Sequence, residues 1–230
     1  MENKLIWGAV AVVLLICVIL VSRKGTTSKA EASTTTKTIA CVGDSITFGS
    51  GVIGHRKTQS YPAILQQLVG DEYQVSNFGI RSRTLVSTGD FPYIKEKYYE
   101  ESLAMQADIY IMMLGTNDSK PFNWDRERYE TELAAFIQQY KETPNVSKLI
   151  LMQPPKAFPI DGVVKYEISN DTISNEIRDI VAKVGEAQGC DVIDLYALTE
   201  DHPDWFMDGV HPNKEGNQAI AEEIAKHISE

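Results

Sequence analysis

Five short runs of the chain are mostly apolar, and this feature limits the possible folds more than any other. The runs are Thr38–Val42, Tyr73–Phe78, Asp108–Leu114, Lys148–Gln153 and Asp191–Leu195. Half-exposed antiparallel strands alternate apolar and polar side chains, whereas parallel strands are buried on both faces and are apolar throughout. The sequence therefore predicts a parallel sheet of five strands.

Amphipathic helical patterns lie between these runs. Apolar side chains recur about every 3.6 residues over Ser60–Val69, Asp125–Lys141, Asp171–Ala187 and Lys214–Ser229, and another helix is expected over Tyr93–Gln106. Strands that alternate with helices favour an α/β fold with helices on both faces of the sheet. Folds of this class bind ligands at the carboxyl ends of their strands. The irregular stretch Pro154–Asn170 is long enough to be a substrate-binding loop.

The N-terminal part of the chain has a different composition from the rest. Leu5–Val21 is an uncharged apolar stretch, close to the lower length limit for a membrane-spanning helix. Gly25–Lys37 is rich in Ser, Thr, Lys and Ala and cannot bury enough apolar surface to fold. We therefore divide the chain into a membrane anchor or signal segment at residues 1–24, a flexible linker at 25–37 and one domain at 38–230.

Two interpretations of the apolar stretch remain open. Ala30-Glu31-Ala32 has the small-x-small form of a signal-peptide cleavage site, but it lies far beyond the apolar stretch, which favours an uncleaved anchor. Basic residues are denser after the stretch, and the positive-inside rule would then leave the domain in the cytoplasm. The polar linker, and the class of substrate expected for this domain, fit the outer side of the membrane better. We expect an extracytoplasmic domain, either anchored or secreted.

The charge of the domain excludes several classes of partner. Residues 1–36 hold four of the 22 basic and two of the 32 acidic residues, so the rest of the chain has a net charge of −12. Such a domain is not expected to bind nucleic acid or an anionic membrane surface. Three cysteines form no disulfide framework, and the sequence contains no metal-ligand or phosphate-loop motif. No cofactor is expected.

Four polar motifs fall where this fold predicts a site. They are Gly43–Gly49 (GDSITFG) after the first strand, Asn77-Phe78-Gly79 at the end of the second, Gly115–Asp118 (GTND) after the third, and Asp208–Asn213 (DGVHPN) before the last helix. Glycines in the first motif let the backbone turn sharply, so that the Ser45 hydroxyl stands free at the strand end. Each motif alone is weak evidence, but together and in this order they indicate a catalytic site.

The residue types in these motifs suit acyl transfer, which needs a nucleophile, a base, a group that orients the base, and oxyanion donors. Ser45 can be the nucleophile and His211 the base. Asp208, three residues earlier in a turn, can bond the other imidazole nitrogen and fix its tautomer. The N–H groups of Ser45 and Gly79, together with the Asn117 side-chain amide, can hold the oxyanion.

The four motifs resemble those of the SGNH, or GDSL, hydrolase family across residues 38–230. The resemblance implies a flavodoxin-like three-layer α/β/α fold and ester substrates. Carried over motif by motif, it implies a site built from Ser45, Gly79, Asn117, Asp208 and His211. One position departs from the pattern: many members have a second glycine where this chain has Ser82, and the oxyanion donor is expected to be Gly79 rather than this residue.

Three further residues are candidate substrate contacts. Asp44 adjoins the nucleophile, Arg81 follows the second strand and can bind an acidic group, and Trp205 can form a wall on which a sugar stacks. Surface exposure for Arg81 and core packing for Trp205 are the alternatives.

The motifs around Ser45, Asn117 and His211 are most similar to the branch of the family that includes carbohydrate O-acetylesterases. An esterase for small acyl groups, acetyl above all, on a carbohydrate is therefore the leading hypothesis. A lysophospholipase- or thioesterase-type acyl hydrolase is the second. The third, a non-catalytic carbohydrate-binding module, leaves the combination of Ser45, Asp208 and His211 without a purpose. The oligomeric state stays open.

Overall fold

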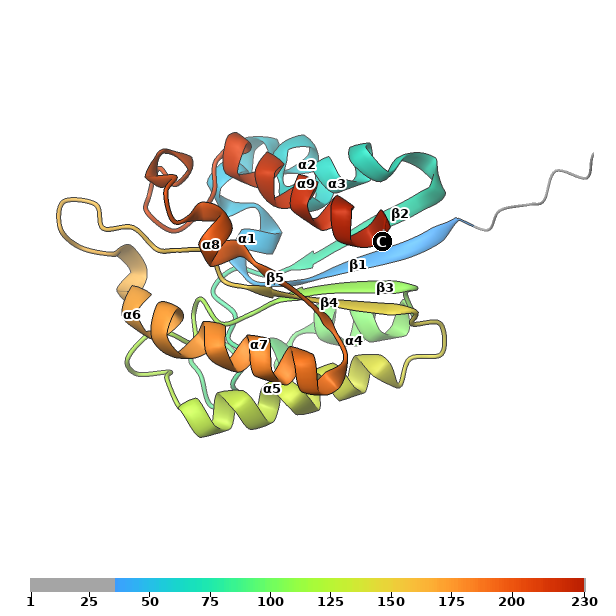
Figure 1. Cartoon of the computed structure of the whole chain (residues 1–230), viewed down its shortest axis with the longest axis horizontal. Coiled ribbons are helices and arrows are strands. Elements are labelled where there is room, and N and C mark those ends of the chain that lie inside the picture. The colour runs from blue at the N-terminus through green and yellow to red at the C-terminus, as the bar shows by residue number, and fades with distance from the viewer. Residues whose placement is uncertain (1–35, 230) are drawn as a thin grey trace, which may run out of the picture. The chain divides into compact units, whose positions relative to one another are not determined.

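The computed structural model describes residues 36–229 and confirms the five parallel strands (Figure 1). The strands are β1 (Lys37–Gly43), β2 (Tyr73–Gly79), β3 (Ile109–Met113), β4 (Lys148–Gln153) and β5 (Asp191–Asp194). Their order in the sheet is β2-β1-β3-β4-β5, and every neighbouring pair is parallel. The chain thus places β2 on one side of β1 and then crosses to the other side, where it adds β3, β4 and β5 in order. The carboxyl ends of β1 and β3 flank the point where this direction reverses.

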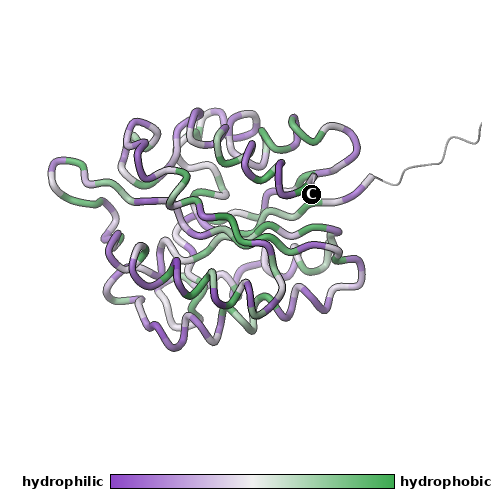
Figure 2. Tube along the Cα trace, viewed as in Figure 1, coloured by the Kyte–Doolittle hydropathy of each residue, from purple (hydrophilic) through white to green (hydrophobic). Residues whose placement is uncertain are grey.

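Helices cover both faces of the sheet. One face packs against α3 (Tyr61–Val69) and α9 (Lys214–Ser229), and the other against α4 (Lys97–Ala104), α5 (Arg126–Lys141) and α7 (Arg178–Gln188) (Figure 1). Successive strand side chains point to opposite faces. In β1, Ile39 and Cys41 therefore join the α3/α9 core, whereas Ala40 and Val42 join the α5/α7 core. Figure 2 shows hydrophobic residues gathered in the strands, and helices in which hydrophobic and hydrophilic residues alternate.

The shorter elements lie mainly at the carboxyl edge of the sheet. They are α1 (Ser45–Phe48), α2 (Arg56–Gln59), α6 (Asn170–Thr172) and α8 (Leu195–Thr199). Two of the expected helices are interrupted. The helix expected over Tyr93–Gln106 is a 3₁₀ turn at Tyr93–Lys95 followed by α4, and a π-helical turn at Ile173–Ile177 separates α6 from α7.

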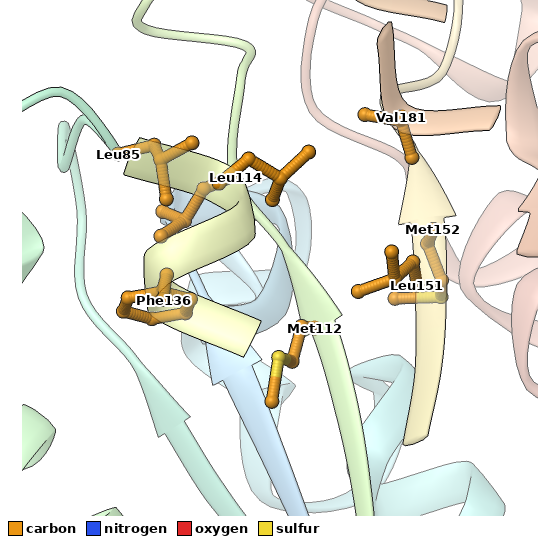
Figure 3. Close-up of a pocket in the computed structure, with 8 residues that line it drawn as sticks. Leu85, Met112, Leu114, Phe136, Leu151, Met152 and Val181 are labelled. Atoms are coloured by element: carbon orange, nitrogen blue, oxygen red, sulfur yellow. The ribbon is translucent and has the colours of Figure 1, made fainter. Parts of the chain in front are cut away.

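The core beneath α5 and α7 is tightly packed. A cavity of about 10 Å³ lies between these helices and the sheet, and its walls are the side chains drawn in Figure 3. All eight of its lining residues are apolar, among them Leu114, Phe136 and Val181. A space of this size, lined by apolar side chains, is too small for a ligand and offers few partners to a water molecule.

The anchor or signal segment expected at residues 1–24 lies outside the described residues, as does nearly all of the linker expected at 25–37. Lys37, the last residue of that linker, is the first residue of β1. Within residues 36–229, none of the helices combines the length and the apolar character needed to span a bilayer.

Candidate active site

Side chains from three of the four motifs meet around one cavity at the carboxyl edge of the sheet. Ser45 follows β1, Asn117 follows β3, and Asp208 and His211 lie in the turn before α9. The cavity has a volume of about 350 Å³. Its walls are Ser45, Ser50, Arg81, Ser82, Thr116, Asn117, Lys120, Tyr166, Glu167, Ile168, Asp208, Val210 and His211. The site predicted from the sequence is therefore placed where the fold rule expects it.

The turn after β1 presents Ser45 as the first residue of α1. The Asp44 carboxylate accepts a hydrogen bond from the Ile46 N–H at 2.9 Å and so caps this short helix. Gly43 is required here, because a Cβ atom would lie 2.2 Å from Thr47 Oγ1 and 2.5 Å from the Met113 carbonyl oxygen. Ser45 is 6% exposed, so its hydroxyl reaches the cavity while the rest of the residue is buried.

A line of hydrogen bonds joins Ser45, His211 and Asp208. Ser45 Oγ lies 2.8 Å from His211 Nε2, and His211 Nδ1 lies 2.6 Å from Asp208 Oδ2. An ionised carboxylate can only accept, so Nδ1 carries the proton and Nε2 has a free lone pair for the serine proton. The three residues stand in the relative positions of nucleophile, base and orienting acid.

Backbone N–H groups fix the Asp208 carboxylate. Its Oδ1 atom accepts from the N–H groups of Val210 at 3.0 Å and His211 at 2.8 Å. Burial disfavours the charged carboxylate, but the His211 ring and these two N–H groups outweigh burial and hold the pKa of Asp208 below its usual range. Asp208 therefore stays ionised, as an orienting partner of His211 must be.

The Asn117 side chain is held with its amide nitrogen in a defined place. Nδ2 donates to the Arg83 carbonyl oxygen at 3.1 Å and lies 3.5 Å from Asp44 Oδ2. The second distance is long for a hydrogen bond. One Nδ2 hydrogen is thus used by the scaffold and the other can serve a ligand in the cavity.

The geometry argues against Gly79 as an oxyanion donor. Its N–H donates to Asn77 Oδ1 at 2.9 Å, and the residue packs against α1 so closely that a Cβ atom would lie 2.2 Å from the Phe48 nitrogen. Gly79 does not line the cavity. Its role is to let β2 approach α1, so the prediction for this residue is corrected.

Ser82 lies where a backbone donor is needed. It lines the cavity beside Ser45 and Asn117 and has a φ of 67°, in the left-handed region that favours glycine. In the part of the chain that the structure describes, its N–H donates to no protein acceptor. In the sequence, Ser82 stands out only because it replaces a glycine of the family pattern. The glycine that other family members have at this position was the signal for the backbone donor, because glycine often marks a position that requires positive φ.

The three candidate substrate contacts are placed differently. Arg81 is exposed and lines the cavity. Asp44 is fully buried, and this burial raises its pKa to about 6. Trp205 stacks on His202 at a centroid distance of 3.8 Å and is not part of the cavity wall. Because Asp44 is fully buried, it does not meet a ligand in this cavity, and its assignment as a substrate contact is corrected. Trp205 is half-buried and lies outside the wall of this cavity, and its role as a stacking surface stays a prediction.

Two residues of the site were not predicted. Asp118 is fully buried and accepts from the N–H groups of Leu85 at 3.0 Å and Val86 at 2.9 Å, so it fixes the loop that carries Ser82. Burial raises the pKa of Asp118 to about 7. Tyr166 reaches the triad from the loop after β4, and its hydroxyl donates to Asp208 Oδ2 at 3.1 Å.

Comparison with known sequences identifies relatives of this domain. Residues 41–219 match the GDSL-like Lipase/Acylhydrolase family. An acetylxylan esterase of Xylanibacter ruminicola is 36% identical over 209 residues, which are 83% of this chain and 42% of that protein. A GDSL esterase/lipase of Arabidopsis thaliana is 28% identical over 117 residues, which are 44% of this chain and 47% of that protein. The chain thus spans less than half the length of these two relatives.

Solved structures show the same fold. The aryl esterase of M. smegmatis has a TM-score of 0.67 at 18% identity, over 84% of this chain and 98% of that chain. A carbohydrate acetylesterase of Sinorhizobium meliloti has a TM-score of 0.65 at 19% identity, over 84% and 98% of the two chains. At this level of identity the similarity establishes the three-layer α/β/α fold alone.

Proposed function

This chain belongs to the GDSL-like lipase/acylhydrolase family, and we propose that it is a serine esterase that removes small acyl groups, acetyl above all, from a carbohydrate. Membership supports its assignment as a carboxylic ester hydrolase. The observation that carries the proposal is the line of hydrogen bonds from Ser45 through His211 to Asp208 at the wall of an open, polar cavity.

The proposed mechanism proceeds through an acyl-enzyme. Ser45 Oγ attacks the ester carbonyl carbon while its proton moves to His211 Nε2. The tetrahedral oxyanion is held by Asn117 Nδ2 and by the backbone N–H groups of Ser45 and Ser82. The intermediate collapses, the imidazolium gives its proton to the leaving alkoxide, and the alcohol departs. Water then gives a proton to His211 and attacks the acyl group, which leaves as a carboxylic acid when Ser45 is restored.

The character of the cavity supports a short acyl group on a polar substrate. Of the thirteen lining residues only Ile168 and Val210 are aliphatic, whereas a long acyl chain needs a continuous apolar wall. The related acetylxylan esterase also favours this class of substrate. The exposed Arg81 guanidinium is the proposed contact for an acidic group on the carbohydrate.

We propose in addition that the domain acts outside the cytoplasm. The support is the apolar stretch Leu5–Val21 in the sequence, which fits an anchor or a signal segment. Protease treatment of cells whose outer membrane, where one is present, has been removed tests this location: degradation of the domain supports it, and full protection until the cytoplasmic membrane is lysed excludes it.

Hydrolysis of p-nitrophenyl esters by the full 230-residue chain tests the esterase proposal. We expect turnover of the acetate ester in the parent protein and a loss of several orders of magnitude in Ser45→Ala. Ser147→Ala is the matched control, because Ser147 is an exposed serine directly before β4, at the opposite edge of the sheet. Equal turnover in the parent and Ser45→Ala, or none in a folded parent, excludes the proposed mechanism.

A chain-length series separates the remaining alternatives. A rate that falls steeply from acetate to octanoate supports the small-acyl assignment, and release of acetate from acetylated xylan supports the carbohydrate. A rate that rises with chain length favours the lysophospholipase- or thioesterase-type hydrolase instead. Binding of the glycan without hydrolysis of any ester favours the non-catalytic module.

A further inference from the structure

Tyr166 contacts both partners of the proposed nucleophile. Its hydroxyl lies 3.1 Å from Asp208 Oδ2, the same oxygen that accepts from His211 Nδ1 at 2.6 Å. Its ring lies against the His211 imidazole, with a centroid distance of 5.4 Å and an angle of 58° between the rings. The residue lines the cavity and is 53% exposed. It therefore stands between solvent and the His211–Asp208 hydrogen bond.

The loop that carries Tyr166 is fixed at both ends. Near its start, the Phe158 N–H donates to the Gly209 carbonyl oxygen at 2.8 Å, which joins the loop to the triad turn. Near its end, the Ser169 N–H donates to Ser119 Oγ at 3.1 Å, and Ile168 is buried in the core. The position of Tyr166 over the triad is thus set by the scaffold.

The backbone of Tyr166 is strained. Tyr166 and Glu167 both have a φ of 60°, in the left-handed region that residues other than glycine seldom adopt. Such a conformation is unfavourable for a residue with a Cβ atom and persists only where the surroundings impose it. Two such residues in succession, at the rim of the cavity, are consistent with a side chain placed for a function.

We propose that Tyr166 is a positioning residue of the esterase: it fixes the Asp208 carboxylate against the His211 ring and shields their hydrogen bond from water. The inference rests on the proposed function of the triad. The hydroxyl is protonated in this setting, because burial and the adjacent Asp208 charge raise the pKa of Tyr166. It can therefore donate at neutral pH, and Asp208 Oδ2 is shared between two donors.

The shared oxygen predicts a direction for the pH profile. Without the Tyr166 hydroxyl, Asp208 Oδ2 has one hydrogen-bond donor fewer, and the carboxylate interacts more strongly with the protonated His211 ring. The other charged groups that face this part of the site are Asp44, Arg81, Lys120 and Glu167, and Tyr166→Phe changes none of them. The acidic limb of the activity profile should thus move to higher pH.

Three tyrosine variants of the full chain test this inference with p-nitrophenyl acetate. Tyr166→Phe should lower kcat about threefold to tenfold with KM unchanged within about twofold, since one net hydrogen bond at a half-exposed position is lost. The acidic limb should shift upward by about half a pH unit. Tyr166→Ala should lower kcat further, because the ring no longer excludes water. Tyr98→Phe, at an exposed position on α4, is the matched control and should match the parent.

A substrate-independent readout separates this inference from the esterase proposal. The His211 Nδ1 proton should appear far downfield in the proton NMR spectrum and should move further downfield in Tyr166→Phe, because Asp208 becomes a stronger acceptor. A displaced resonance in a protein that hydrolyses no ester would leave the inference standing and overturn the function. An unchanged resonance, an unchanged acidic limb and parent-like kcat in Tyr166→Phe would overturn the inference, whatever the substrate.

Discussion

Asp208→Asn removes one charge from the triad while preserving its shape, and the structure fixes how the new amide must sit. The N–H groups of Val210 and His211 both donate to Asp208 Oδ1. The amide oxygen must take this place, because an NH₂ group there would face two donors. The amide nitrogen is then turned toward His211 Nδ1, where the parent has the second carboxylate oxygen.

This orientation forces the wrong tautomer of the imidazole. An amide N–H donates to His211 Nδ1, so the ring proton moves to Nε2, which faces Ser45 Oγ. A protonated Nε2 cannot accept the serine proton. We expect kcat to fall by about four orders of magnitude, as for the same exchange in a serine protease triad, which corresponds to about 5.5 kcal/mol of activation free energy.

The assay is p-nitrophenyl acetate hydrolysis beside a thermal melt of each protein. The melting temperature should change by only a few degrees, because both backbone hydrogen bonds to the side chain are kept. Asp204→Asn is the matched control: Asp204 lies in the same stretch of chain, its side chain is 75% exposed, and it contacts His202 only at 4.0 Å. An Asp208→Asn variant with more than about a tenth of parent activity would refute the tautomer argument.

Three further predictions concern the oxyanion donors and the buried carboxylates. Asn117→Ala should lower kcat for p-nitrophenyl acetate about 100- to 1,000-fold with little change in KM, because it removes one donor. Ser82→Gly should keep kcat within about twofold and leave the melting temperature equal or higher, since glycine keeps the N–H and adopts the φ of 67° without strain. The melting temperature should fall as the pH rises from about 4 to about 7, because burial raises the pKa of Asp44 to about 6 and that of Asp118 to about 7, so the folded chain retains protons that the unfolded chain has released.

Each of these outcomes can be contradicted. Parent-like kcat in Asn117→Ala would exclude the amide as a donor. A loss of more than about tenfold in Ser82→Gly would show that the hydroxyl, not the backbone N–H, holds the oxyanion. A melting temperature that stays level or rises between pH 5 and pH 7 would mean that Asp44 and Asp118 are ionised in the folded protein at little cost.

Most of the fold could be predicted because the three central strands β1, β3 and β4 are buried on both faces, so that their apolar runs nearly coincide with the strands. The expected run Lys148–Gln153 coincides with β4, and Thr38–Val42 falls one residue short of β1 at each end. The interruptions in the helices were not predictable in the same way. A π-helical turn at Ile173–Ile177 keeps the apolar spacing almost unchanged, so periodicity does not detect it.

The site could be predicted only in part, because a motif gives the residue types but not the directions in which their side chains and N–H groups point. Asp44 adjoins the nucleophile in sequence, but its carboxylate turns inward to cap α1. Gly79 and Ser82 lie three residues apart, and only the backbone conformation shows which of the two N–H groups is free. Tyr166 lies in Pro154–Asn170, the stretch expected to be a substrate-binding loop, but it belongs to no motif. The path of this loop depends on a contact with the distant Gly209, so no local pattern singles out Tyr166 within it.

The parallel order of the sheet also determines when the site can form during folding. β1 pairs with β3 through residues 70 positions apart, Ile39 with Ile109, and Ser45 meets His211 across 166 positions. No ladder of this sheet is a local hairpin that could form early, and contacts of such long range make folding slow. The triad is complete only when the first strand and the last helix are both in place. Recovery of esterase activity after dilution from denaturant should therefore follow recovery of helical circular dichroism, and the delay would measure the final closure of the chain.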